Sequence, residues 1–245
     1  MFFSPLAQFD VVCVIPFYFF TIDLSFTNLV LTLFLVLGFF FLIFYLLFPS
    51  RLIYRTWQIL MENIFLVAFR ILNEQIGKNG LIYFPFIFSL FTFILLLNLF
   101  SLMPYGFAVT SHLIWTMYFS LSICLGIFFI GIYNHGILFL RLFVPEVPLA
   151  LYPLMIVIEI LSYIIRSFSL AIRLSANIIA GHTLVHILAQ FILTLCSMKK
   201  FIVILPYFLI FAIFVLEFGV AFLQAYIFVT LVCMYLNDSV NFVSH

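Results

Sequence analysis

The fold is decided by residues 154–198, which read LMIVIEILSYIIRSFSLAIRLSANIIAGHTLVHILAQFILTLCSM. A helix of this length extends about 70 Å, whereas the hydrocarbon core of a bilayer is about 30 Å thick. The segment therefore either breaks into pieces or forms one strongly tilted helix. No proline or glycine occurs between Leu154 and Ala180, and Gly181 is the only weak point. We expect one long, oblique helix.

Polar side chains interrupt this apolar segment. Ionisable groups inside a membrane cost several kcal/mol each and by default mark an ion pathway or a paired site. Glu159, Arg166 and Arg173 are spaced by seven residues, and Asn177 follows four residues later. At about 100° per residue, these four side chains fall within roughly 40° of one another on a helix. The segment therefore has one polar face, which Ser169 flanks.

The composition of the whole chain supports the membrane assignment. Of 245 residues, 68% are hydrophobic and 7% are charged, whereas a soluble domain carries about 25% charged residues. So few charges cannot cover a surface that faces water, so the outside must face lipid. The net charge of +1 excludes an electrostatic case for binding nucleic acid.

Charge-free intervals and prolines divide the chain into elements. We expect an all-α membrane protein with about five transmembrane or steeply tilted helices and one amphipathic surface helix, in a single membrane domain of residues 1–245. Pro153 should keep helix out of the loop before the final hairpin. The expected elements are a first span at 26–48, the surface helix at 51–78, a helical hairpin at 82–133 and a long tilted hairpin at 154–236.

The stretch 51–78 allows two interpretations. Its charges recur at about one or two helical turns among apolar residues, which favours a helix along the membrane surface, and a soluble hairpin is the alternative. It carries four of the nine basic residues, so we expect it on the matrix or cytoplasmic side. The N-terminus, with Asp10, then lies on the opposite side.

Three polar pairs line up when the final hairpin is counted outward from the chain reversal at Lys199-Lys200. Glu217 and Gln224 lie seven residues apart in the returning segment. The expected pairs are His182 with Glu217, Arg173 with Gln224, and Glu159 with Asp238. The two outer pairs contain groups that can relay protons when burial brings their titration toward neutral pH.

Arg173 separates the two proton-bearing zones. An arginine does not lose its proton in a protein, so it blocks direct proton hopping between the zones and favours the ionised form of a nearby carboxylate. Two half-paths divided in this way imply a moving carboxylate, supplied by another chain, that carries protons around the block.

These residues resemble a known family. The run from Glu159 to His182 looks like the central signature of subunit a of the F-type ATP synthase, and Gln224-Ala-Tyr-Ile-Phe resembles the final helix of that family. The run Asn98-Leu-Phe-Ser-Leu-Met-Pro is similar to the family's Asn-Leu-x-Gly-x-x-Pro turn, with Ser101 in place of glycine. The opening Ser-Pro-Leu-Ala-Gln-Phe-Asp10, and the order of His182 before Glu217, are those of the mitochondrial form.

The resemblance implies roles and partners. Arg173 would face the carboxylate of each subunit of the rotor c-ring. His182, Glu217, Asn177 and Gln224 would line a half-channel to the intermembrane space, and Glu159 and Asp238 the exit to the matrix. Accessory positions would be Ser169, Arg166, His186 and Asp10. The implied setting is the mitochondrial inner membrane, with b-type and subunit 8-type stator subunits, lipid, translocated protons and, indirectly, F1 as partners.

Other interpretations remain open at this point. Arg173 could be a structural charge paired with Glu159 or Glu217, and Arg166 could reach an interface or a lipid head group. His182 and His186 lie one turn apart, but no second buried histidine pair faces them, so we expect no metal or haem. No phosphate-binding loop occurs, so ATP chemistry would belong to other subunits and no cofactor is expected.

A different functional class is a self-contained ion transporter or a membrane subunit of a respiratory complex. Such a transporter often has paired halves with broken helices, which the sequence does not show. A subunit whose carboxylate carrier is on a partner should conduct poorly alone. Full proton flux through the purified chain in liposomes would favour the transporter.

Overall fold

The computed structural model describes residues 7–19, 22–23, 25–47, 56–103, 106–136, 139, 152–197 and 204–241. The turn expected around Pro104 and the chain reversal at Lys199-Lys200 lie outside these residues.

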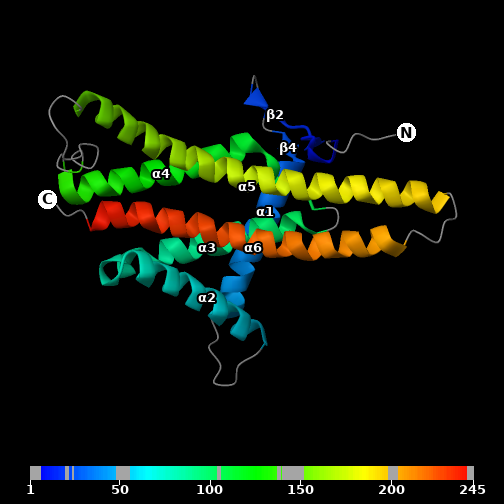
Figure 1. Cartoon of the computed structure of the whole chain (residues 1–245), viewed down its shortest axis with the longest axis horizontal. Coiled ribbons are helices and arrows are strands. Elements are labelled where there is room, and N and C mark those ends of the chain that lie inside the picture. The colour runs from blue at the N-terminus through cyan, green and yellow to red at the C-terminus, as the bar shows by residue number, and fades with distance from the viewer. Residues whose placement is uncertain are drawn as a thin grey trace. The chain divides into compact units, whose positions relative to one another are not determined.

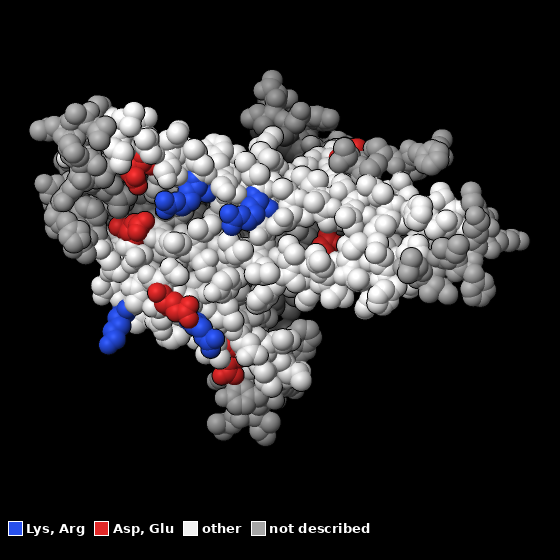
Figure 2. All heavy atoms as spheres, viewed as in Figure 1, with Lys and Arg blue, Asp and Glu red and all other residues white. Residues whose placement is uncertain are grey.

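Six long helices make up most of the described chain (Figure 1). They are α1 (Asn28–Leu47), α2 (Thr56–Gln75), α3 (Phe84–Ser101), α4 (Leu113–His135), α5 (Tyr152–Ser197) and α6 (Ile204–Val240). All of them except α2 are long and apolar enough to cross a membrane. Figure 2 shows charged side chains only as scattered spots on the visible face. The predicted class, an all-α membrane protein, is confirmed.

Helix α2 is amphipathic. Ala68, Ile71 and Leu72 are at most 2% exposed, whereas the charged side chains Glu62 and Glu74 are exposed. The buried positions recur three and four residues apart, which is the spacing of one helical face. An apolar face opposite charged side chains suits a helix along a surface rather than across a bilayer.

The chain forms two compact units. Unit 1 consists of Met1–Pro49, Phe93–His112 and Leu174–Ala225, and unit 2 consists of Ser50–Thr92, Leu113–Arg173 and Tyr226–His245. Helices α3, α5 and α6 contribute residues to both units. A 3₁₀ helix, η2 (Lys78–Tyr83), precedes α3 in unit 2, and another, η3 (Val109–Ser111), follows α3 in unit 1.

Helix α5 is a single helix of 46 residues that continues through Gly181. At 1.5 Å per residue its length is about 69 Å, more than twice the thickness of the hydrocarbon core. Of the two alternatives that its length left open, the unbroken helix is therefore the one that forms.

Two details of the final hairpin differ from the expectation. Pro153 does not prevent helix formation, because it lies in the first turn of α5. Backbone N–H groups in the first turn have no hydrogen-bond acceptor within the helix, so the missing N–H of proline costs no helical hydrogen bond there. Helix α6 also continues past residue 236 to Val240, so Asp238 is helical.

Helices α5 and α6 are antiparallel neighbours in each unit. In unit 1, Glu217 on α6 packs against Gly181 on α5. In unit 2, the ring centroids of Tyr163 on α5 and Tyr235 on α6 are 5.3 Å apart. In both pairs the two residues are equally far along the chain from Lys199, which is the register expected from counting outward.

Short strands precede α1, and the sequence did not predict them. Strand β1 (Cys13–Ile15) pairs antiparallel with β4 (Phe26–Thr27), and β2 (Tyr18–Phe19) pairs with β3 (Ile22–Asp23). A 3₁₀ helix, η1 (Ala7–Phe9), lies before them. Asn28 starts α1 and fixes this segment to it, since its side chain bonds the backbone of both Asp10 and Val12.

Candidate functional site

The carboxyl group of Glu217 occupies space that only a glycine leaves open. Glu217 is 7% exposed. A Cβ atom added at Gly181 would lie 2.5 Å from Glu217 Oε1 and 2.8 Å from its Cδ, much closer than van der Waals contact allows. Oε1 has no hydrogen-bond partner in the described part of the chain. The one weak point of α5 is thus where a carboxyl group from α6 packs.

His182 follows Gly181 and is contacted from two other elements of unit 1. The backbone of Ser101 on α3 lies within reach of its ring. The ring of Phe9 packs on it with centroids 6.2 Å apart and planes at 85°. Its Nε2 atom is buried and finds no partner among the described residues. His182 and Glu217, predicted as a pair, therefore lie in one neighbourhood.

Asn98 belongs to the same unit and was not among the predicted site residues. It is fully buried on α3, and its Nδ2 donates a hydrogen bond of 3.2 Å to the carbonyl of Ala221. Ala221 lies one turn after Glu217 on α6, and Asn98 Oδ1 has no described partner. An amide within a charge-free apolar run was the signal that could have identified it.

The other predicted residues of unit 1 differ in burial. Gln224 is 5% exposed, and Asn177 is half-buried. His186 lies one turn beyond His182, and its buried Nδ1 lacks a partner in the described part. The side chain of Asp10 is exposed on the N-terminal segment.

Unit 2 brings Glu159 and Asp238 together, as expected. Asp238 lies near enough to Glu159 and Arg166 for both charges to act on it. The guanidinium carbon of Arg166 lies 5.3 Å from the ring centroid of Tyr235, a cation–π contact. Tyr235 is 4% exposed. Arg166 therefore contacts an aromatic ring and lies near one carboxylate, that of Asp238.

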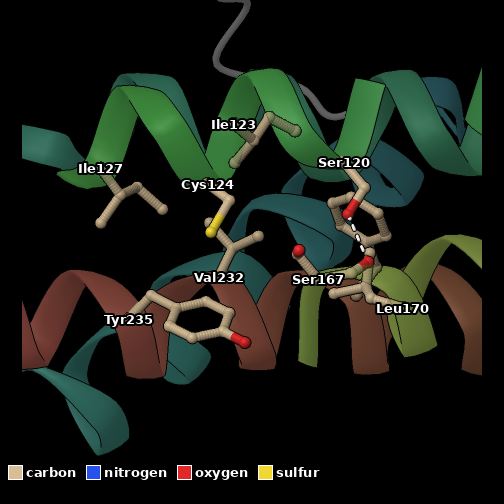
Figure 3. Close-up of a pocket in the computed structure, with 9 residues that line it drawn as sticks. Ser120, Ile123, Cys124, Ile127, Ser167, Leu170, Val232 and Tyr235 are labelled. Atoms are coloured by element: carbon tan, nitrogen blue, oxygen red, sulfur yellow. Dashed lines mark hydrogen bonds between the residues drawn. The ribbon is translucent and has the colours of Figure 1, made fainter. Parts of the chain in front are cut away.

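A small cavity adjoins this group in unit 2 (Figure 3). Its volume is about 10 Å³, which is room for about one water molecule. Ser120 Oγ on α4 donates a hydrogen bond of 2.8 Å to the carbonyl of Ser167 on α5 at its edge. The side chains of Cys124 and Tyr235 also line it, and the buried hydroxyl of Tyr235 has no described partner.

Arg173 is exposed on α5. In the described part of the chain no hydrogen bond or ion pair holds it, and Ser169, one turn earlier, is exposed as well. Arg173 belongs to unit 2 and Gln224 to unit 1, so their pairing stays a prediction.

Comparison with known proteins places the chain in a family. The sequence profile described as ATP synthase A chain matches residues 27–237. An ATP synthase subunit a of Chondrus crispus is 43% identical over 242 residues, covering 96% of this chain and 95% of the relative. Proteins of the same name from Acanthamoeba castellanii (43%, 98% and 99%) and Marchantia polymorpha (40%, 97% and 98%) are similar over nearly their full lengths. With a profile match over most of its length and full-length relatives, this chain belongs to the ATP synthase A chain family.

Proposed function

We propose that this chain is the proton-translocating stator subunit of the Fo sector of an ATP synthase, with two half-channels that Arg173 separates. Its partners would be the rotor c-ring, b-type and subunit 8-type stator subunits and, indirectly, F1, where ATP chemistry takes place. Its location would be the mitochondrial inner membrane. The names of its relatives and the order of His182 before Glu217 support this assignment.

The first half-channel would run from the intermembrane space to the group around His182. Buried polar atoms without protein partners are costly unless water satisfies them. Unit 1 has such atoms on Asn98, His182 and Glu217, and they lie on three neighbouring helices. Water joined to these atoms would give protons a path to the rotor, with Asn177 and Gln224 as further polar positions.

The second half-channel would start at Glu159 and Asp238 and lead to the matrix. Two carboxylates close together hold a proton more readily than either does alone, because like charges disfavour double ionisation. Arg166 lies near Asp238, and its positive charge opposes this effect there. The pair can therefore accept a proton from a rotor carboxylate and release it again without binding it permanently.

The observation that carries the proposal is the exposed position of Arg173 on α5, with no described protein group to neutralise it. An uncompensated charge is costly at bilayer depth. A carboxylate on a neighbouring protein would remove that cost and would ionise as it approached. In the sequence of α5, Arg173 lies fourteen residues after Glu159 and nine before His182. A rotor carboxylate that passes Arg173 would therefore move between the half-channel at His182 and the half-channel at Glu159.

The test is replacement of Arg173 in the assembled enzyme. Arg173→Gln and Arg173→Lys should each reduce proton-driven ATP synthesis at least about a hundredfold, the scale of losing one preorganised charge. Glutamine removes the charge, and a lysine at bilayer depth can lose its proton. Arg70→Gln, which changes an exposed arginine of α2, is the matched control and should leave synthesis unchanged. Normal synthesis in either Arg173 variant would refute the barrier role.

A further inference from the structure

The N-terminal segment is fixed to the start of α1 by several bonds. Asn28 Oδ1 accepts a hydrogen bond of 3.2 Å from the Val12 N–H, and Asn28 Nδ2 donates one of 3.1 Å to the Asp10 carbonyl. Strand β1 pairs with β4 immediately before α1. The residues that directly follow Phe9 therefore have a defined position relative to α1.

This attachment places the Phe9 side chain against His182. The two rings are nearly perpendicular, at 85°, with centroids 6.2 Å apart. The backbone of Ser101 also lies within reach of the same imidazole. All of these residues belong to unit 1, and Figure 1 shows the N-terminal strands next to the start of α1. An aromatic ring in this arrangement limits the orientations that the imidazole can adopt.

We propose that Phe9 is a positioning residue for proton transfer at His182. It holds the imidazole in one orientation and shields one side of it from bulk water, so that protons reach the ring from the side of Glu217. This inference rests on the proposed function, because it assigns to Phe9 control of a group in the first half-channel.

The ionisable groups near His182 are few. The N-terminal segment carries Asp10 beside Phe9, α6 carries Glu217, and α5 itself carries His186. Helix α3, with residues Phe84–Ser101, has no ionisable side chain. Phe9 itself carries no charge. If its substitution changes the pH dependence of ATP synthesis, the change would therefore reflect altered surroundings of His182 and these few ionisable side chains.

The experiment uses the whole ATP synthase reconstituted in liposomes, with ATP synthesis measured against the pH of the compartment that supplies protons. Phe9→Ala should lower the rate per assembled enzyme about two- to tenfold and move the pH profile by about 0.4–1 unit, the scale of one aromatic pair. Phe9→Tyr keeps the ring and should behave as the unmodified enzyme. Phe17→Ala, at an exposed position of the same segment, is the matched control and should change neither quantity.

A double-substitution cycle separates this inference from the proposed function. If Phe9 acts through His182, Phe9→Ala should have no further effect in a His182→Gln enzyme. A Phe9→Ala enzyme with an unchanged pH profile and rate per enzyme, even if less enzyme assembles, would show that the contact only packs the segment and would overturn the inference. Unaltered synthesis in His182→Gln alone would instead refute the half-channel assignment.

Discussion

Replacement of Gly181 by alanine tests the contact between α5 and α6 most directly. The added methyl group would lie 2.5 Å from Glu217 Oε1, and ordinary contact begins at 3.4 Å. The carboxyl group must therefore move by about 0.9 Å, the difference between these two distances. Overpacking of this kind costs about 1–3 kcal/mol, while alanine gains about 1 kcal/mol in helix propensity over glycine. The net loss of stability should be at most about 2 kcal/mol.

The effect on function should be larger than the effect on stability. A displacement of about 1 Å in a group that takes part in transfer can reduce a rate about a hundredfold. We expect Gly181→Ala to lower proton-driven ATP synthesis about ten- to a hundredfold per assembled enzyme. The assay is synthesis by reconstituted enzyme under an imposed pH gradient, normalised to the amount of this chain in the purified complex.

The matched control is Gly219→Ala on α6, where an added Cβ meets nothing within 4 Å. It carries the same gain in helix propensity and should leave synthesis unchanged. Glu217→Asp, which shortens the side chain by one methylene, should partly restore the Gly181→Ala enzyme. Full activity of Gly181→Ala at normal enzyme levels would show that the position of the Glu217 carboxyl group does not matter for transfer.

Two further predictions concern unit 2 and the start of α4. Tyr235→Leu removes the ring beneath Arg166, a contact worth about 0.5–2 kcal/mol, and should slow proton-driven synthesis several-fold. Tyr235→Phe keeps the ring and should leave the rate of synthesis unchanged. Equal rates in the two variants would contradict a role for the cation–π contact. Burial lowers the pKa of His112, which lies outside the spans, from its ordinary 6.5, so the neutral ring is favoured in the folded chain. The contribution of neutral His112 to the stability of the folded chain is full above pH 6.5 and is lost as the pH falls through the lower folded pKa. An NMR titration of the His112 ring signal, assigned by its loss in His112→Gln, should therefore have its midpoint below pH 6.5. A midpoint at pH 6.5 or higher would rule out the lowered pKa.

The helices and their pairing follow from local properties of the sequence. An apolar run long enough to cross a bilayer must be helical, because lipid offers no partner to the backbone, and this accounts for α1, α3, α4, α5 and α6. The short connection after α5 requires α6 to return alongside it, so counting from Lys199 was sufficient to relate Glu159 to Asp238 and the region of His182 to Glu217.

The contacts between distant segments could not be obtained in this way. Asn98 and Ala221 are 123 residues apart, and nothing local to α3 indicates which helix its amide will meet. Strands β2 and β3 have only two residues each, too few for an alternating pattern to be recognised. Phe9 looked like part of a family opening and gave no sign of contact with a histidine of α5.

The sequence by itself determined that this chain is a helical membrane protein and that titratable groups lie on both sides of Arg173 along one helix. These conclusions depend on hydrophobic length and helical periodicity, which are properties of neighbouring residues. The tertiary structure alone decided which atoms meet: the Glu217 carboxyl at Gly181, the Arg166 guanidinium over Tyr235 and the Phe9 ring against His182. Such contacts depend on how the side chains of separate elements fill shared space, and local periodicity contains no information about that.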